Sequence, residues 1–236
     1  MKVKSFNTRS EGYKIEGNIH FPGHHQSAPC VICSHGLFSS KESSKFIAMA
    51  EQLAGEGFVA IRYDHRGCGV SEGKIEETTV SDRLKDLDSI IRFIGQRFSI
   101  TRRIGLFGSS MGGYISLLKA AQVPPVSAVV VWATPFKLGG TRRDYNEEGY
   151  PLLEESFYED LNNHKLLEII GRIKRCFVLH GQKDELVPVW HSNKIYENLA
   201  DPKKIEIFPC GDHRFTDVTD RKRAMDLSLK FFKNYL

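Results

Sequence analysis

Long apolar runs are missing from this sequence of 236 residues. The longest, residues 126–133, is far shorter than the roughly 20 residues that a membrane-spanning helix requires. Residues 1–17 have no apolar core between their charges, so they lack the pattern of a secretory signal. We therefore expect a cytoplasmic protein with no membrane partner.

The sequence has few cysteines, and their number is odd. Five cysteines in a chain of this length do not resemble a disulfide framework. Cys30 and Cys33 have C-x-x-C spacing, yet they fall in an apparent strand, where side chains three positions apart point to opposite faces. His24 and His25 have no Cys, Asp or Glu at ligand spacing, and we interpret them as a solvated turn. We expect no metal and no other cofactor.

A strong excess of charge of one sign is also absent. The net charge of +4 is small for the length. The Lys/Arg clusters at 142–143 and 221–223 are short, and no nucleic-acid-binding motif accompanies them, so no nucleic-acid partner is expected. Hydrophobic content of 41% with 26% charged residues is ordinary for a globular protein.

What the sequence does contain is a regular alternation of strand and helix patterns. Residues 2–7 and 13–21 alternate as two antiparallel strands with one wetted face would. Short apolar runs then alternate with stretches of helical spacing, which predicts a doubly wound, mostly parallel α/β sheet. The predicted strands are 30–34, 59–63, 104–107, 127–133, 175–180 and 204–208, and the predicted helices are 43–56, 81–98, 114–121, 189–199 and 217–235.

Residues 134–165 interrupt this alternation with prolines, glycines and many charges. We interpret them as an insertion at the edge of the sheet. The length suits a single domain over residues 1–236 with a cap or lid at about 134–165. Ser81 or Asp82 is the expected N-cap of the second predicted helix.

The sequence Gly-Ser-Ser-Met-Gly at residues 108–112 stands between a predicted strand and a predicted helix. Strand, sharp turn and helix with G-x-S-x-G at the turn is the signature of a nucleophile elbow. Gly108 and Gly112 lack Cβ atoms, so strand and helix can approach closely while Ser110 adopts a strained backbone conformation. The Met111 N–H lies at the start of the helix, where backbone donors lack partners and favour negative charge.

Two further residues suit a serine nucleophile, which needs a base and an acid that orients the base. Asp184 follows a strand end, and His213 lies on the loop after the last strand, so both are expected at the carboxyl edge of the sheet. Glu185 and Asp212 are rival acids. We expect Glu185 to point away, and Asp212 is adjacent in sequence to the histidine that it would have to orient.

The loop after an early strand, His35-Gly36-Leu37, is the candidate for the second half of an oxyanion hole. The expected donors are the Leu37 N–H and the Met111 N–H, and Gly36 lets the backbone come close to the substrate. His35 and His180 are expected to orient loop backbone rather than to act as bases.

Over nearly its whole length the chain resembles the α/β-hydrolase superfamily, and within it the small bacterial carboxylesterases of the cinnamoyl/feruloyl esterase type. The resemblance rests on the segments at 35–37, 64–71 and 108–113 and on Asp184 and His213, in the order Ser, Asp, His. It implies ester hydrolysis through an acyl-enzyme, with the 64–71 segment structural. The cap of the feruloyl enzymes is longer than residues 134–165. Five aromatic residues of this segment are candidates for a pocket wall: Phe136, Tyr145, Tyr150, Phe157 and Tyr158.

The prediction is therefore a serine hydrolase that cleaves small-molecule carboxylic esters, working as a monomer or homodimer. A thioesterase or an amidase or aminopeptidase of the same fold remains open, because the choice of leaving group depends on the shape of the pocket. The alternative from another class is a ligand-binding module that keeps the fold without the chemistry.

Overall fold

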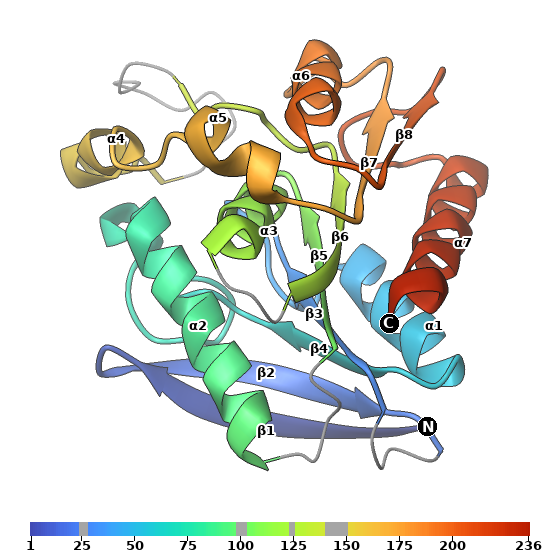
Figure 1. The fold of residues 1–236 in the computed structure, drawn as a ribbon. Coiled ribbons are helices and arrows are strands. Elements are labelled where there is room, and N and C mark those ends of the chain that lie inside the picture. The colour runs from blue at the N-terminus through green and yellow to red at the C-terminus, as the bar shows by residue number, and fades with distance from the viewer. Residues whose placement is uncertain (24–27, 98–102, 123–125, 140–150) are drawn as a thin grey trace.

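The predicted alternation of strands and helices builds an eight-stranded sheet with helices on both faces (Figure 1). A computed structural model describes residues 1–23, 28–97, 103–122, 126–139 and 151–236. The strands are β1 (Lys2–Ser10), β2 (Tyr13–Phe21), β3 (Cys30–Ser34), β4 (Val59–Tyr63), β5 (Ile104–Ser109), β6 (Val126–Trp132), β7 (Cys176–Gly181) and β8 (Lys203–Phe208). Their order in the sheet is β1-β2-β4-β3-β5-β6-β7-β8.

The six strands from β3 to β8 are parallel, whereas β1 and β2 are antiparallel to their neighbours. Strands β3, β4, β5 and β7 are buried along their whole length, as strands covered on both faces must be. β1 extends beyond the predicted residue 7. Glu11 and Gly12, with φ of 48° and 93°, form the kind of two-residue turn that lets Ser10 pair directly with Tyr13. The predicted α/β sheet is confirmed.

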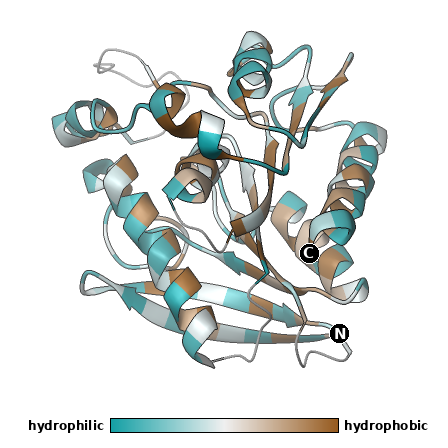
Figure 2. Ribbon diagram, in the orientation of Figure 1, coloured by the Kyte–Doolittle hydropathy of each residue, from teal (hydrophilic) through white to brown (hydrophobic). Residues whose placement is uncertain are grey.

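Helices cover the two faces of the sheet in separate groups (Figure 1). They are α1 (Ser44–Gly55), α2 (Val80–Arg97), α3 (Met111–Gln122), α4 (Glu155–Leu161), α5 (Leu166–Ile169), α6 (Trp190–Asn198) and α7 (Val218–Tyr235), with short 3-10 turns η1 (Ile75–Glu77) and η2 (Ile170–Arg172). α1 and α7 pack against one face, and α2 and α3 against the other. Figure 2 shows apolar residues alternating with hydrophilic ones along α2 and α7, as helices with one buried side require.

The two hydrophobic cores show to which face of the sheet Cys30 and Cys33 each point. Cys30 belongs to the core beneath α2 and α3, whereas Cys33 belongs to the core beneath α1 and α7. The prediction that they point to opposite faces is confirmed. His24 and His25 lie outside the described residues.

The N-cap of α2 differs from the prediction. The helix begins at Val80, and Thr79 and Asp82 bond each other reciprocally, Asp82 N–H to Thr79 Oγ1 at 3.1 Å and Thr79 N–H to Asp82 Oδ2 at 3.0 Å. This is a capping box with Thr79 at the N-cap. Ser81 instead donates from its backbone and hydroxyl to Asp160 of α4.

The described parts of the 134–165 segment are tied to the body of the protein. Besides the contact from Ser81, the Tyr114 hydroxyl of α3 donates to the His164 carbonyl at 2.6 Å. The Phe157 side chain is buried and packs edge-on against Tyr158. Tyr145 and Tyr150 lie outside the described residues. Among the helices that are described, none has the length and apolarity to cross a membrane.

Candidate active site

Ser110 occupies the turn between β5 and α3 with φ of 55°, in the left-handed region that side chains other than glycine rarely adopt. Its carbonyl accepts the first helical hydrogen bonds, from Gly113 N–H at 2.9 Å and Tyr114 N–H at 3.1 Å. The predicted strained conformation is therefore confirmed. A strained serine held by its surroundings is a common feature of functional sites.

Glycines permit the close packing around this turn. A Cβ atom on Gly112 would lie 2.0 Å from the Ser34 carbonyl oxygen, and one on Gly108 would lie 2.3 Å from the Gly112 carbonyl oxygen. Neither contact is possible for any other residue without moving backbone. The first turn of α3 thus lies directly against the end of β3, from which the His35-Gly36-Leu37 loop leaves the sheet.

That loop reaches Ser110. A Cβ atom on Gly36 would lie 3.5 Å from Ser110 Cβ and 4.0 Å from Ser110 Oγ. The buried His35 ring bonds the Gly36 carbonyl through Nδ1 at 2.7 Å, and its Nε2 accepts from the His65 N–H at 3.1 Å. His35 Nδ1 is therefore the protonated nitrogen. Burial, with the nearby His65 and Arg83, holds the pKa of His35 well below its ordinary value. His35 orients loop backbone, as predicted.

Asp184 and His213 lie side by side. His213 Nδ1 is 3.0 Å and 2.9 Å from the two Asp184 carboxylate oxygens, and each residue is only 8% exposed. A carboxylate in this position fixes the tautomer of the imidazole and stabilises its protonated form. The nitrogen left free for chemistry is Nε2.

The Asp184 carboxylate has further partners that were not predicted. It accepts from Leu186 N–H at 3.0 Å and Val187 N–H at 2.7 Å, and its other oxygen is 3.0 Å from His180 Nε2. Burial opposes ionisation, but the bonds from His180, His213 and Val187 outweigh it and hold the pKa of Asp184 well below its ordinary value. His180 also bonds the Val187 carbonyl at 2.7 Å, so it orients loop backbone as expected.

Backbone contacts align the loops that carry this pair. Lys183 N–H donates to the Gly211 carbonyl at 2.9 Å, and Gln182 N–H donates to the Phe208 carbonyl at 2.8 Å. A Cβ atom on Gly181 would lie 2.2 Å from the Gly211 carbonyl oxygen. The loops after β7 and β8 are thus in backbone contact.

Trp132 at the end of β6 connects this pair to the turn at Ser110. Its carbonyl accepts from the Ser110 N–H at 2.9 Å, and its ring packs against Phe215, with centroids 4.9 Å apart. Phe215 lies two residues after His213 on the same loop. The predicted residues thus share the carboxyl edge of the sheet. The hydrogen bond between the Ser110 hydroxyl and His213 stays a prediction.

The two rival acids have other partners. Glu185 was expected to point away, but it does not. Its carboxylate accepts from the backbone N–H of His213 at 3.3 Å. The prediction was wrong because the loop that carries His213 packs on the 184–185 turn and brings its backbone N–H to the Glu185 carboxylate. Asp212 accepts from the N–H and hydroxyl of Thr216. The hydrogen bonds to the His213 ring come from Asp184.

The 64–71 segment is bonded to other parts of the protein near the site. Asp64 is fully buried and accepts from the backbone and side chain of Lys41, at 2.6 Å and 2.9 Å. Arg66 pairs with the buried Asp86 of α2 at 2.9 Å. Gly69 has φ of 53°, and a Cβ atom there would lie 2.2 Å from the Asp64 carboxylate. These contacts fit the structural role that the resemblance implies.

Sequence reasoning missed two cations near the site, the partly buried Lys45 and the fully buried Arg83. Lys45 Nζ donates to the Ser109 hydroxyl at 2.8 Å, and burial lowers the pKa of Lys45 to about 8. Arg83 Nη2 donates to the Leu37 carbonyl at 3.2 Å. Arg83 left a trace in the sequence, since it shares the apolar stripe of α2 with Val80 and Leu87. For Lys45 we find no such trace.

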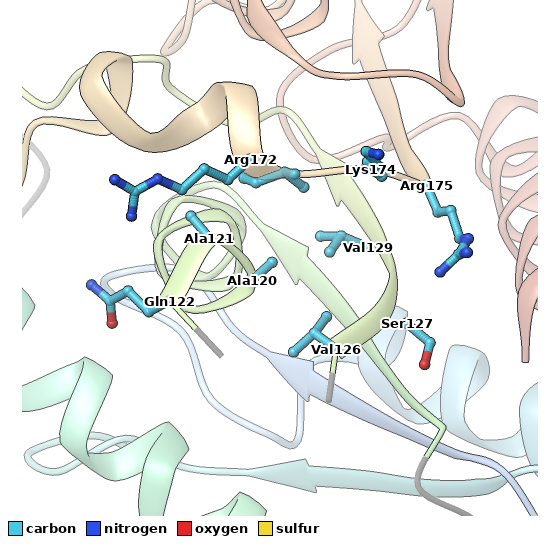
Figure 3. A pocket seen from close by; sticks show the side chains of 10 residues that line it. Ala120, Ala121, Gln122, Val126, Ser127, Val129, Arg172, Lys174 and Arg175 are labelled. Atoms are coloured by element: carbon cyan, nitrogen blue, oxygen red, sulfur yellow. The ribbon is translucent and has the colours of Figure 1, made fainter. Parts of the chain in front are cut away.

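A pocket at the opposite edge of the sheet offers different chemistry. It lies where α3 ends and β6 and β7 begin, and three of its lining residues are the cations Arg172, Lys174 and Arg175. Figure 3 shows the side chains of Arg172 and Arg175 extending in opposite directions. The described lining includes no histidine, aspartate or glutamate. No group of three or more His, Cys, Asp or Glu residues in the described ranges is arranged to hold a metal ion.

The family model of the serine aminopeptidases, S33 (Hydrolase_4) matches residues 25–153. This range includes the elbow and the 35–37 loop. The chain belongs to the serine aminopeptidase S33 family. The predicted membership of the α/β-hydrolase superfamily is thereby confirmed.

The proteins similar to this S33 family member include a named thioesterase and a protein solved with ferulic acid bound. Mouse (Mus musculus) mitochondrial palmitoyl-protein thioesterase ABHD10 is 28% identical over 217 residues, covering 81% of this chain and 71% of the relative. Its structure matches with a TM-score of 0.80 at 24% identity over 99% of both chains. Est1E from Butyrivibrio proteoclasticus, solved with ferulic acid, matches with a TM-score of 0.85 at 19% identity, covering 97% of this chain and 99% of Est1E. At these identities the structural matches support the fold alone.

The buried Asp86 predicts an acid-dependent stability of this S33 hydrolase. Burial opposes its ionisation, but His65 and Arg66 lower its pKa from 3.8 to about 2. Because the folded-state pKa lies below the ordinary value, the stabilisation is fully present above about pH 4 and is lost as the pH falls toward 2. It is worth roughly 2 kcal/mol. Urea unfolding between pH 6 and 2 should show a shallower loss of stability in Asp86→Asn than in the wild type; parallel curves would contradict this.

Proposed function

We propose that the protein is a serine carboxylesterase with Ser110 as nucleophile, His213 as base and Asp184 as the acid that orients the base. The observation that carries the proposal is the pairing of His213 Nδ1 with the buried Asp184 carboxylate at the same sheet edge as the strained Ser110. A serine at a strained turn, a histidine and a buried acid form the minimal set for acyl transfer.

In the proposed reaction the Ser110 hydroxyl oxygen attacks the carbonyl carbon of the ester. His213 Nε2 takes the hydroxyl proton and returns it to the alcohol oxygen as the carbon–oxygen bond breaks, which leaves an acyl-enzyme. A water molecule then attacks the acyl carbon and loses a proton to His213. The bond from that carbon to Ser110 Oγ breaks, His213 returns the proton to Oγ, and the carboxylic acid is released. Asp184 stabilises the imidazolium during both steps.

The proposed oxyanion hole consists of the Leu37 and Met111 N–H groups. Met111 is the first residue of α3, where backbone donors lack helical acceptors. Leu37 follows Gly36, which packs against the Ser110 side chain. Such donors contribute roughly 2.7–4 kcal/mol each to the stabilisation of the transition state. The main chain supplies both, so their placement depends on the loop and the helix rather than on side-chain identity.

We further propose that residues 1–236 form one domain in which the 134–165 segment roofs the pocket. The packing of Phe157 and the bonds from Ser81 and Tyr114 to this segment support a cap held on α2 and α3. The partner implied is a small-molecule ester. The oligomeric state, monomer or homodimer, and a cytoplasmic location stay predictions.

Fluorophosphonate labelling tests the nucleophile. The wild-type protein should carry the adduct on Ser110, and Ser110→Ala should lower turnover of p-nitrophenyl acetate by a factor on the order of 10⁴ or more with little change in melting temperature. Mass spectrometry of the labelled peptide locates the adduct.

The neighbouring serine provides a matched control. Ser109 is buried and its hydroxyl is bonded to Lys45, so Ser109→Ala should still be labelled on Ser110. His213→Ala should abolish the labelling. A folded wild-type protein that stays unlabelled would overturn the proposal and favour the ligand-binding alternative.

A thioesterase is the second candidate, favoured by the named activity of the ABHD10 relatives. An acyl-CoA offered beside p-nitrophenyl esters from acetate to decanoate and methyl ferulate separates the candidates. If the protein is an esterase, kcat/KM should be higher for the best oxygen ester than for the acyl-CoA, and all turnover should depend on Ser110. Turnover of the thioester alone would replace esterase by thioesterase without changing the roles of the residues.

A further inference from the structure

Arg83 lies in α2 with its side chain directed into the protein, and it is fully buried. Its Nη2 donates to the Leu37 carbonyl at 3.2 Å and lies 3.4 Å from Cys68 Sγ. The Cys68 thiol also reaches the Leu37 carbonyl, at 3.6 Å. The guanidinium therefore contacts the 35–37 loop at Leu37, whereas the same loop approaches Ser110 at Gly36.

This guanidinium lacks the partners that a buried cation normally has. Its Nε and Nη1 atoms are buried without a hydrogen-bond partner. Within the described ranges, no carboxylate forms an ion pair with it. A buried cation without a paired anion is strongly unfavourable, and an unsatisfied buried donor calls for an explanation. A structural role alone would be served at lower cost by an apolar side chain.

The position of Leu37 supplies that explanation. The peptide before Leu37 carries the Leu37 N–H and the Gly36 carbonyl, and the latter is bonded by His35 Nδ1. The peptide after it carries the Leu37 carbonyl, which Arg83 and Cys68 hold. Because both adjoining peptides are held, the backbone dihedral angles of Leu37 are fixed. The direction of its N–H is fixed with them.

We propose that Arg83 is a positioning residue of the oxyanion hole: it holds the Leu37 carbonyl and places a positive charge next to the loop that would bind the developing oxyanion. The inference rests on the proposed acyl-transfer function. A buried positive charge that is held in place in the resting protein gains a favourable interaction when the transition state becomes negative, and this is how preorganised groups accelerate a reaction. Arg83 does not touch the substrate.

The matched test compares Arg83→Met, which keeps length and removes charge and donors, with Arg83→Lys, which keeps the charge. In Arg83→Met, kcat for p-nitrophenyl acetate should fall about 10- to 100-fold while KM changes less than about twofold, because the lost interaction belongs to the transition state. Arg83→Lys should recover part of the lost kcat. Affinity for a trifluoromethyl ketone, which forms a tetrahedral oxyanion adduct, should fall in parallel with kcat.

Lys119→Met is the control for loss of a buried cation. Lys119 is 4% exposed and pairs with Asp88 at 2.8 Å, on the far part of α3. This variant should lose stability, but it should not show the fall in kcat at nearly constant KM that is expected of Arg83→Met. If Arg83→Met does not fold, Arg83→Gln, which keeps a polar amide but removes the charge, decides, with a several-fold lower kcat and unchanged KM expected. Wild-type kcat and inhibitor affinity in the folded Arg83→Met, or otherwise in Arg83→Gln, would overturn the inference.

Failure of the inference differs from failure of the proposed function. If the wild-type protein is labelled on Ser110 and the Arg83 variants keep wild-type kcat, only the role of Arg83 is wrong. If the wild-type protein is not labelled, the acyl-transfer function falls, and the role of Arg83 falls with it.

Discussion

The packing of the first turn of α3 against the end of β3 determines most of what surrounds Ser110. At Gly112 there is no room for a side chain, because the Ser34 carbonyl lies 2.0 Å from where a Cβ would stand. That contact brings the loop of Gly36 close to the Ser110 side chain, next to the first turn of α3. The left-handed backbone of Ser110, φ 55°, is the conformation that this packing imposes. A larger residue at 112 would separate Ser110, the proposed nucleophile, from the 35–37 loop.

A second set of close backbone contacts organises the proposed acid and base. Gly181 and Gly211 let the loops after β7 and β8 touch, so Asp184 meets His213 although 29 residues separate them. Asp184 is held by backbone amides and by His180, and it keeps its charge although it is buried. The side chains of the site are thus positioned by rigid elements and by hydrogen bonds from groups that do not react, as preorganised sites require.

Spacing along the chain predicted the parallel strands, the elbow and the pairing of Asp184 with His213, because strand ends and glycine turns are local features. The position of Glu185 depends on which loops pack together, which spacing does not contain. The capping of α2 by Thr79 and the bond from His180 to Asp184 join residues three and four positions apart, so they are local features that the prediction missed. Arg83 is an intermediate case. An arginine on an apolar helix stripe signals a buried cation, but only the fold shows that it faces the Leu37 carbonyl. The choice of substrate depends on a pocket wall partly outside the described residues.

The most direct measurement is a crystal structure of the protein after reaction with a phosphonate ester. The proposed mechanism predicts phosphorus on Ser110 Oγ, with a phosphonyl oxygen about 2.7–3.1 Å from both the Leu37 and the Met111 nitrogen atoms. His213 Nε2 should face the oxygen of the leaving group, with Nδ1 still on Asp184. An adduct on another residue, a phosphonyl oxygen held by neither amide, or an imidazole turned away from Ser110 would contradict the assignment.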